Sequence, residues 1–246
     1  MTEPLFLGDL DSPQVGHKVA LRGDEGRHAL AVRRIRVGEI VCIGDGAGTA
    51  VRGPVVEAGK GELVIEVAEV LQARQAPVRY VAVQALPKGD RAELAVEMLT
   101  ELGIDEIVPW QAERSIVKWA PERVERGLSR WRIAAREAAK QCRRLRVPTI
   151  AAPMTTAELA LRIEQTALTA VLHENATEPL AGLSMPAEGE IMFIVGPEGG
   201  LSDGEVAAFA AAGGHVVLIA ESVLRTSTAG VVALAQIQAL GIRDAR

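Results

Sequence analysis

The chain has 246 residues, of which 48% are apolar and only 3% aromatic, and its formal net charge is −5. This length allows one large domain or two small ones, and a core with so few aromatic residues must consist mainly of Leu, Val, Ile and Ala. No apolar run approaches the roughly 18 residues of a transmembrane helix, and the first residues lack the basic segment and long apolar stretch of a signal peptide, so we expect neither.

Residues 1–72 contain several short strand patterns and no long helical pattern. Strands are predicted at 19–22, 39–43 and 62–67. The glycine-rich segment 44–48 is predicted to be a hairpin turn between strands, because no helical pattern follows it. Short strands without a long helix favour a small β-barrel.

Residues 73–77 form a predicted linker, after which the pattern of residues 78–246 alternates between strands and helices. This alternation predicts an α/β fold with a mostly parallel sheet and helices on both faces. Strands are predicted at 79–86, 106–108, 148–151, 169–172, 191–195 and 216–220, and helices at 90–102, 122–145, 155–165, 202–212 and 227–240.

Cys42 and Cys142 are the two cysteines of the chain, and they suggest neither a disulfide framework nor a metal-ligand cluster. His173 has no second His or Cys at ligand spacing. We therefore expect a reduced, cytoplasmic setting and no bound metal.

The predicted helix at 122–145 is strongly basic, with seven Lys and Arg residues between 129 and 146 and one acid, Glu137. Trp131, Ala138 and Cys142 recur at helical spacing and form a buried stripe, which places the basic residues on an exposed face. A solvated surface and a contact with RNA phosphates are both consistent with this pattern. The candidate RNA-binding residues, including a second cluster near His28, are Arg33, Arg34, Arg36, Arg132, Arg136, Lys140, Arg143 and Arg144.

The most informative segment is 194–205, an apolar strand that ends in a glycine-rich loop and opens a helix. Ser202 and Glu205 have the spacing of a capping box. The loop lacks the Lys-Ser/Thr of a P-loop and the glycine spacing of the dinucleotide-binding fingerprint. A loop of this kind at the end of a buried strand is where α/β proteins bind ligands, although an ordinary strand-to-helix turn is also consistent with it.

Gly196–Gly200, followed by Leu224–Thr226 and Thr228–Ala229, resembles the cofactor loops of the SPOUT superfamily of methyltransferases. Within that superfamily the chain is most similar to the bacterial family that methylates N3 of a uridine in 16S ribosomal RNA, ribosomal RNA small subunit methyltransferase E. The resemblance covers nearly the whole chain. Further matching blocks are Lys88–Arg91, Glu101–Gly103, Val108–Pro109, Glu113–Ser115, Trp131, Glu137–Ala138, Gln141–Cys142 and Val147–Pro148.

This resemblance implies a PUA-like RNA-binding barrel over residues 1–72 and a SPOUT α/β domain over 78–246. It also implies a trefoil knot with 194–200 and 218–229 among the knotted loops. The implied partners are 16S ribosomal RNA or the small ribosomal subunit, without membrane or metal. A homodimer is implied as well, with the cofactor site near the subunit interface.

The implied cofactor is S-adenosylmethionine, with its adenine bound by backbone groups of the glycine-rich loop. Leu218 and Leu224 would supply apolar contacts and Thr228 a hydroxyl. The residues expected to bind the cofactor are Leu172, His173, Glu174, Gly196, Pro197, Gly199, Gly200, Leu218, Leu224, Thr226, Thr228 and Ala229.

Methylation of uracil N3 requires removal of the N3 proton or stabilisation of the resulting anion. We expect Arg225 to offset charge on a uracil carbonyl oxygen, and Glu198 or Glu137 to take the proton. A salt bridge of Arg225 with Glu198 or Glu221, and acceptance of backbone hydrogen bonds by Glu198, are the structural alternatives.

The chain departs from the family pattern at two positions, because Ser222 replaces the usual Arg and Ser227 replaces the usual Glu. A carboxylate role at position 227 therefore cannot be transferred to this chain. Two other functions stay open: a different SPOUT reaction, such as 2′-O-ribose or N1-purine methylation, or a non-catalytic RNA-binding protein of ribosome assembly.

Overall fold

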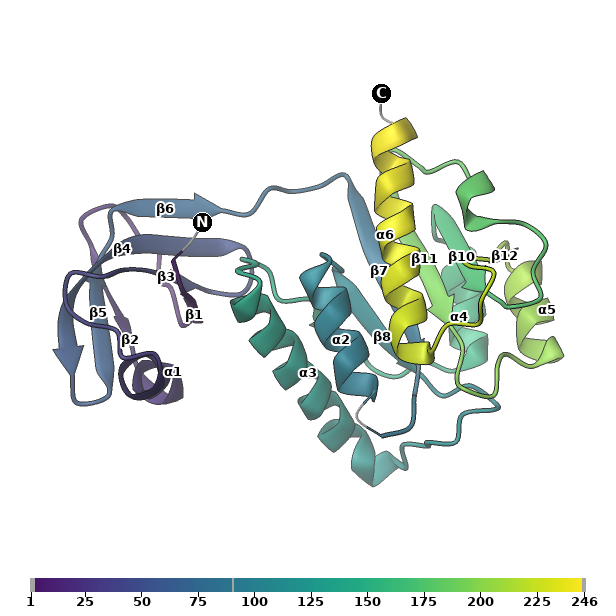
Figure 1. Ribbon diagram of the computed structural model, residues 1–246, viewed down its shortest axis with the longest axis horizontal. Coiled ribbons are helices and arrows are strands. Elements are labelled where there is room, and N and C mark those ends of the chain that lie inside the picture. The colour runs from purple at the N-terminus through teal and green to yellow at the C-terminus, as the bar shows by residue number, and fades with distance from the viewer. Residues whose placement is uncertain (1–2, 90, 245–246) are drawn as a thin grey trace. The chain divides into compact units, whose positions relative to one another are not determined.

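The computed structural model describes residues 3–89 and 91–244, so Asp90, where the helix at 90–102 is predicted to begin, lies outside the described residues. The chain forms two compact units. The N-terminal unit comprises the residues up to Gln75 together with Arg136–Val147, and the C-terminal unit comprises Ala76–Ala135 and the residues from Pro148 onward (Figure 1).

The N-terminal unit contains a six-stranded sheet in which the strands follow the order β1-β3-β4-β5-β2, with β6 paired to β4. β1 and β3 are parallel, and the other pairs are antiparallel. The strands are β1 (Leu5–Leu7), β2 (Lys18–Leu21), β3 (Ile40–Gly44), β4 (Thr49–Gly59), β5 (Glu62–Glu66) and β6 (Glu69–Gln72), and the helical segments are α1 (Gly23–Arg27) and a π-helical turn, His28–Val32.

The hairpin predicted at 44–48 is confirmed, since β3 and β4 pair antiparallel with Gly44 opposite Ala50. β4 is a long strand that the sequence does not predict, because Gly53 and Pro54 are unfavourable inside strands. The structure shows why glycine is required at position 53, because a Cβ there would lie 1.8 Å from the carbonyl oxygen of Glu66. Only glycine allows the two backbones to approach this closely.

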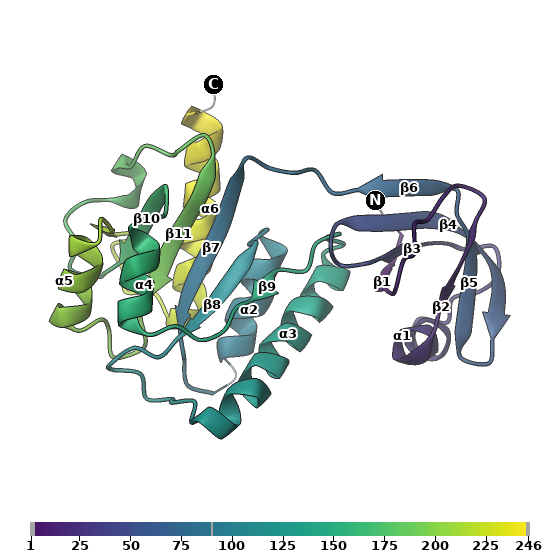
Figure 2. The same ribbon diagram turned by 180° about the vertical axis from the view of Figure 1, so that it is seen from behind.

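The C-terminal unit contains a six-stranded sheet in the order β12-β10-β11-β7-β8-β9, and every neighbouring pair is parallel. α2 and α6 lie on one face and α4 and α5 on the other (Figures 1 and 2), as the alternating pattern predicts. The strands are β7 (Val78–Ala85), β8 (Glu106–Trp110), β9 (Thr149–Ile150), β10 (Leu168–Leu172), β11 (Gly189–Val195) and β12 (His215–Val217). The helices are α2 (Arg91–Glu101), α3 (Val124–Gln141), α4 (Thr156–Ile163), α5 (Asp203–Ala211) and α6 (Thr226–Asp244), with short 3₁₀ turns at Pro121–Arg123 and Leu180–Gly182.

Two elements end three or four residues earlier than predicted. α3 stops at Gln141 instead of 145, and Arg143 then adopts a positive φ of 58°, a conformation that does not continue a right-handed helix. β12 stops at Val217 instead of 220, because the next residue, Leu218, exchanges backbone hydrogen bonds with Glu178 and Leu180.

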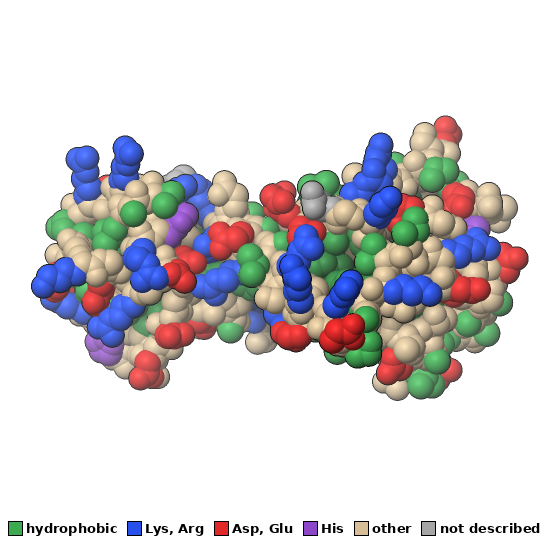
Figure 3. All heavy atoms as spheres, turned by 90° about the horizontal axis from the view of Figure 1, so that it is seen from below, with side chains coloured by type: hydrophobic (Ala, Val, Ile, Leu, Met, Phe, Trp, Pro, Cys, Tyr) green, Lys and Arg blue, Asp and Glu red, His purple; other side chains and the backbone are tan. Residues whose placement is uncertain are grey.

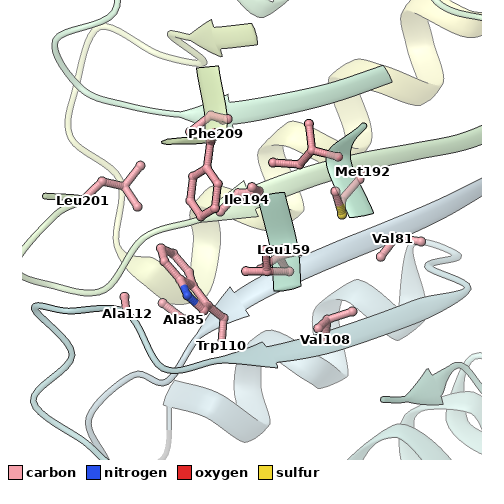
Figure 4. Packing of buried hydrophobic residues seen from close by; sticks show 13 residues of the cluster. Val81, Ala85, Val108, Trp110, Ala112, Leu159, Met192, Ile194, Leu201 and Phe209 are labelled. Atoms are coloured by element: carbon pink, nitrogen blue, oxygen red, sulfur yellow. The ribbon is translucent and has the colours of Figure 1, made fainter. Parts of the chain in front are cut away.

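The core between the sheet and helices α4 and α5 is aliphatic around one aromatic pair (Figure 4). Trp110 at the end of β8 and Phe209 of α5 are fully buried, with ring centroids 5.3 Å apart in an edge-to-face arrangement. Such pairs contribute about 0.5–1.5 kcal/mol beyond their buried area. The pair anchors α5, whose N-terminal end follows the glycine-rich loop.

Four charged side chains form an ion network at the amino edge of the parallel sheet. Glu106 at the start of β8 bonds to Arg79 and to Arg162, and its Oε1 lies 2.8 Å from Nη1 of Arg162. Glu190 of β11 bonds to the same two arginines at 2.9 Å. Burial alone raises the pKa of the Glu106 carboxyl, but its hydrogen bonds and charge interactions with the arginines outweigh burial and hold the pKa below its ordinary value.

Candidate functional site

A pocket of about 320 Å³ lies at the carboxyl edge of the parallel sheet in the C-terminal unit. This volume is within the range of small-molecule sites. The loops that follow β10, β11 and β12 and the first turn of α6 form its walls. The lining residues are Arg91, Leu172, His173, Glu174, Val195, Gly196, Pro197, Glu198, Gly200, Leu201, Leu218, Ile219, Ala220, Ser222, Val223, Leu224, Arg225, Thr226 and Ala229.

The structure brings together ten of the twelve residues predicted to bind the cofactor, and Gly199 and Thr228 are the two that do not line the pocket. Gly199 packs instead against Arg114, whose Cβ would lie 3.1 Å from a Cβ at position 199. The Thr228 hydroxyl donates to the carbonyl oxygen of Arg225 at 3.1 Å. The two loops that the resemblance assigns to the knot thus share one pocket.

Sequence reasoning missed seven of the lining residues. Most of them directly adjoin predicted positions in the same loops. Their place in those loops could therefore have predicted that they line the pocket. Arg91 differs, because it comes from the start of α2 and no pattern in the sequence connects it to the glycine-rich loop. The seven residues are Arg91, Val195, Leu201, Ile219, Ala220, Ser222 and Val223.

The glycine-rich loop is held in place by its own capping box and by a neighbouring loop. The Ser202 side chain accepts the N–H of Glu205, and the Glu205 carboxylate accepts the N–H of Ser202, so the predicted capping box is confirmed. The other oxygen of this buried carboxylate accepts the N–H of Glu113 at 2.7 Å. Gly200 has a positive φ of 71°, which favours glycine in this turn.

Arg114 tethers the loop from the side. Its Nη1 donates to the carbonyl oxygen of Leu201 at 2.9 Å and lies 3.4 Å from that of Gly199. Arg114 does not line the pocket, so it is a positioning residue and acts on a ligand only through the loop.

We predict that Arg114→Ala weakens S-adenosylhomocysteine binding about three- to tenfold. A hydrogen bond from a charged donor contributes about 1.5–3 kcal/mol, and partial exposure of Arg114 reduces its contribution to about 1 kcal/mol. Calorimetric titration measures the change, with Lys118→Ala, at an exposed position of the same segment, as the control. Equal affinity in the two variants would contradict the tether.

The two candidate catalytic residues at the pocket differ in their partners. Glu198 is exposed, and its Oε1 accepts the N–H of Lys88 at 3.0 Å, which realises the expected acceptance of a backbone hydrogen bond. Arg225 is exposed and forms no ion pair with any residue that the structure describes, so the salt bridges considered with Glu198 and Glu221 are not present there. Its charge is available to a ligand.

Glu137, the third candidate, does not line this pocket. It belongs to the segment of α3 in the N-terminal unit, where its carboxylate lies 2.7 Å from Nζ of Lys140. It also lines a smaller pocket of about 270 Å³ there, together with His28, Arg33 and Arg143. Its catalytic role stays a prediction.

The basic residues of α3 are less available than their pattern suggests. Lys140 is largely buried and lies 2.8 Å from Glu25 of α1, and Arg136 donates to the carbonyl oxygen of Leu7 at 2.9 Å. Arg132 pairs with Glu125 at 2.6 Å on an exposed surface. The face in Figure 3 accordingly mixes acidic and basic side chains over the molecule.

The remaining candidate RNA-binding residues lie at the surface. Arg33, Arg34, Arg36 and Arg143 are exposed, and Arg144 is half-buried. All belong to the N-terminal unit. The N-terminal unit therefore contains all of the candidate RNA-binding residues except Arg132, which belongs to the C-terminal unit.

The described residues offer no metal centre, since no group of three or more His, Cys, Asp or Glu among them is placed to hold an ion. Burial raises the pKa of the Cys42 thiol to about 11, which keeps it protonated at neutral pH. No helix within residues 3–89 and 91–244 is long and apolar enough to cross a membrane.

Comparison with protein families gives two matches that together span most of the chain. The RNA methyltransferase domain family matches residues 74–238, and the RNA methyltransferase PUA domain family matches residues 21–68. A ribosomal RNA small subunit methyltransferase E from Mycobacterium tuberculosis is 42% identical over 99% of this chain and 94% of its own length. The chain belongs to the ribosomal RNA small subunit methyltransferase E family.

Other members of the family extend the comparison. The member from Bacillus subtilis is 30% identical over 89% of this chain and 88% of its own length. The structure of the member from Neisseria gonorrhoeae, bound to S-adenosylmethionine, is 27% identical with a TM-score of 0.85, covering 97% of this chain and 98% of that one. A methyltransferase from Legionella pneumophila, also with bound S-adenosylmethionine, is 26% identical with the same TM-score and coverage. The expected fold class, a PUA-like domain and a SPOUT methyltransferase domain, is confirmed.

Proposed function

We propose that this chain transfers the methyl group of S-adenosylmethionine to N3 of a uridine in 16S ribosomal RNA. One observation carries the proposal. The loops that resemble the family's cofactor loops form one pocket of ligand size, in a chain whose solved relatives bind S-adenosylmethionine.

The residues of the pocket fit this cofactor. Leu172, Leu201 and Leu218 give an apolar wall suited to an adenine ring, and the backbone of 196–200 offers donors and acceptors for its edge. Gly200 has a positive φ that favours glycine, and its lack of a side chain leaves space in the loop, where a Cβ would lie 3.4 Å from the Glu174 carboxylate. Backbone contacts of this kind do not depend on the departures at Ser222 and Ser227.

When bound, S-adenosylmethionine supplies an electrophilic methyl group, and the chain must prepare the nucleophile. Uracil N3 is poorly nucleophilic while it keeps its proton. The Glu198 carboxylate takes this proton, and the bond from Lys88 N–H to Oε1 orients it. The Arg225 guanidinium stabilises negative charge on a uracil carbonyl oxygen. The base must leave its stack to enter the pocket.

The two domains divide the work in this proposal. Residues 1–72 form the PUA-like domain that binds RNA backbone, residues 73–77 are the linker, and residues 78–246 form the methyltransferase domain. The protein acts as a cytoplasmic homodimer on 16S ribosomal RNA or on the small ribosomal subunit, with Arg33, Arg34, Arg36, Arg132, Arg136, Lys140, Arg143 and Arg144 as the proposed RNA contacts.

The test is methylation of unmodified 16S ribosomal RNA, offered as a transcript and as a reconstituted small subunit, followed by nuclease digestion and mass spectrometry. We expect 3-methyluridine at a single position. A methyl group on a ribose or a purine would support a different SPOUT reaction. RNA binding without S-adenosylhomocysteine binding would support the non-catalytic alternative.

A further inference from the structure

A second pocket, of about 540 Å³, adjoins the cofactor pocket in the C-terminal unit. Arg91 and Glu198 line both pockets, so the two cavities meet at these side chains. Lys88, Gly89, Leu94 and Ile116 complete the lining of the second pocket. These residues come from the start of α2, the loop before it and the loop after β8, and none of them except Glu198 belongs to the glycine-rich loop.

The described lining of this pocket carries two cations, Lys88 and Arg91, and one carboxylate, Glu198. Neither Lys88 nor Arg91 forms an ion pair with a residue that the structure describes. The cations of α3 differ, because Arg132, Arg136 and Lys140 all pair with glutamates. An anionic ligand therefore gains more from the pocket's two cations than from cations that already have partners.

The other wall is apolar and faces solvent. Ile116 is 67% exposed and Leu94 is 44% exposed, although both are large aliphatic side chains. Two cations and two apolar side chains that line one pocket match a nucleotide, in which a phosphate is joined to a sugar and a base that offer apolar surface.

We propose that this second pocket binds the nucleotide next to the target uridine. Lys88 and Arg91 bind its phosphate, and Leu94 and Ile116 contact its sugar or base. The proposal rests on the proposed function, since a target base that reaches the methyl group of the bound cofactor brings its neighbouring phosphate to the boundary between the two pockets. The subsite holds the strand after the base has left its stack.

The variant Lys88→Ala tests this assignment, because Lys88 lines only the second pocket. Binding of a 16S ribosomal RNA transcript is measured by filter retention in the presence of S-adenosylhomocysteine, between 50 and 200 mM KCl. We expect affinity to fall about three- to tenfold and the slope of log K against log salt to become less steep by about 0.7, the value for one phosphate contact of a single strand. Lys118→Ala, at another exposed lysine of this unit, is the matched control and should retain wild-type binding.

The variant Ile116→Ser tests the apolar wall separately. Because Ile116 is largely exposed, its replacement should leave the fold intact, lower RNA affinity and leave the salt slope unchanged. An effect on affinity without an effect on slope distinguishes an apolar contact from a charge contact.

Two results would overturn the proposal: unchanged RNA affinity in Lys88→Ala, or a loss of S-adenosylhomocysteine affinity that accounts for the RNA effect. The second result would mean that the anion recognised here is a carboxylate of the cofactor. If the wild type binds the transcript but forms no 3-methyluridine, the proposed function fails, and the binding measurements still decide whether the subsite exists.

Discussion

Ala229→Trp should abolish measurable S-adenosylhomocysteine binding, with a loss of at least about 100-fold, or about 2.8 kcal/mol. Ala229 lies in the first turn of α6 and lines the cofactor pocket. An indole at this position projects from a rigid helix into a cavity of about 320 Å³ and occupies space that the ligand requires. Calorimetric titration of the purified variant measures the loss.

The matched control is Ala207→Trp, which introduces the same side chain at an exposed position of α5 that does not line the pocket. It should bind S-adenosylhomocysteine as the wild type does. Circular dichroism must show that both variants are folded. Retained binding in a folded Ala229→Trp protein would place the cofactor elsewhere.

Arg162→Met should lower the free energy of unfolding of the C-terminal unit by about 3 kcal/mol at pH 7. Removal of one partner from a buried ion pair leaves an uncompensated charge and costs about 3–5 kcal/mol. The lower value is appropriate because Glu106 keeps Arg79 as a partner, with the Glu106 side chain 9% exposed and that of Arg162 18% exposed. Methionine keeps much of the buried stem of the arginine.

The loss in this variant should also depend on pH. The folded-state pKa of Glu106 lies below its ordinary value near 4.5, so in the wild type its contribution to stability is present above about pH 4.5 and is lost as the pH falls through the folded value. Without Arg162, burial raises the pKa of Glu106, and protonation at low pH relieves the buried charge. The difference between variant and wild type should therefore be large at pH 7 and should shrink as the pH falls below about 4.5.

Urea titration followed by tryptophan fluorescence measures this difference. Trp110, Trp119 and Trp131, the three tryptophans of the chain, all lie in the C-terminal unit, so their signal follows that unit. Arg132→Met breaks an exposed ion pair of the same unit and should cost less than about 1 kcal/mol. Equal losses in the two variants would contradict the importance of the network.

The sequence predicts the C-terminal unit well because its strands are buried on both faces. Residues 191–195 form an unbroken apolar run that is followed by glycine and proline. The observed strand, β11, ends at Val195, which is the last residue of that run. The N-terminal unit was harder to predict. β4 contains Gly53 and Pro54, and its strand conformation depends on pairing with β3, β5 and β6.

In the candidate site, too, residues close to a motif in the sequence could be predicted, whereas contacts between residues far apart in the sequence could not. Loop residues next to the glycine-rich motif were found because the motif itself is local. The partners of the basic helix were not found, since Glu25 lies more than a hundred residues before Lys140 in the chain. Lys88 and Arg91 belong to a block that resembles the family, but no local pattern connects them with Glu198, because that relation exists only in three dimensions.

The N-terminal unit is discontinuous in the chain, and this affects the order in which it can form during translation. Its sheet is synthesised by Gln75, but the segment 136–147 that completes it follows only after another sixty residues. Until then Glu25 lacks Lys140, and the backbone of Ala47 lacks its partner Arg146. The N-terminal unit therefore emerges from the ribosome unfinished, and it can be completed only after more than a third of the C-terminal unit has been synthesised. Any graft of this unit onto another enzyme must include the end of α3.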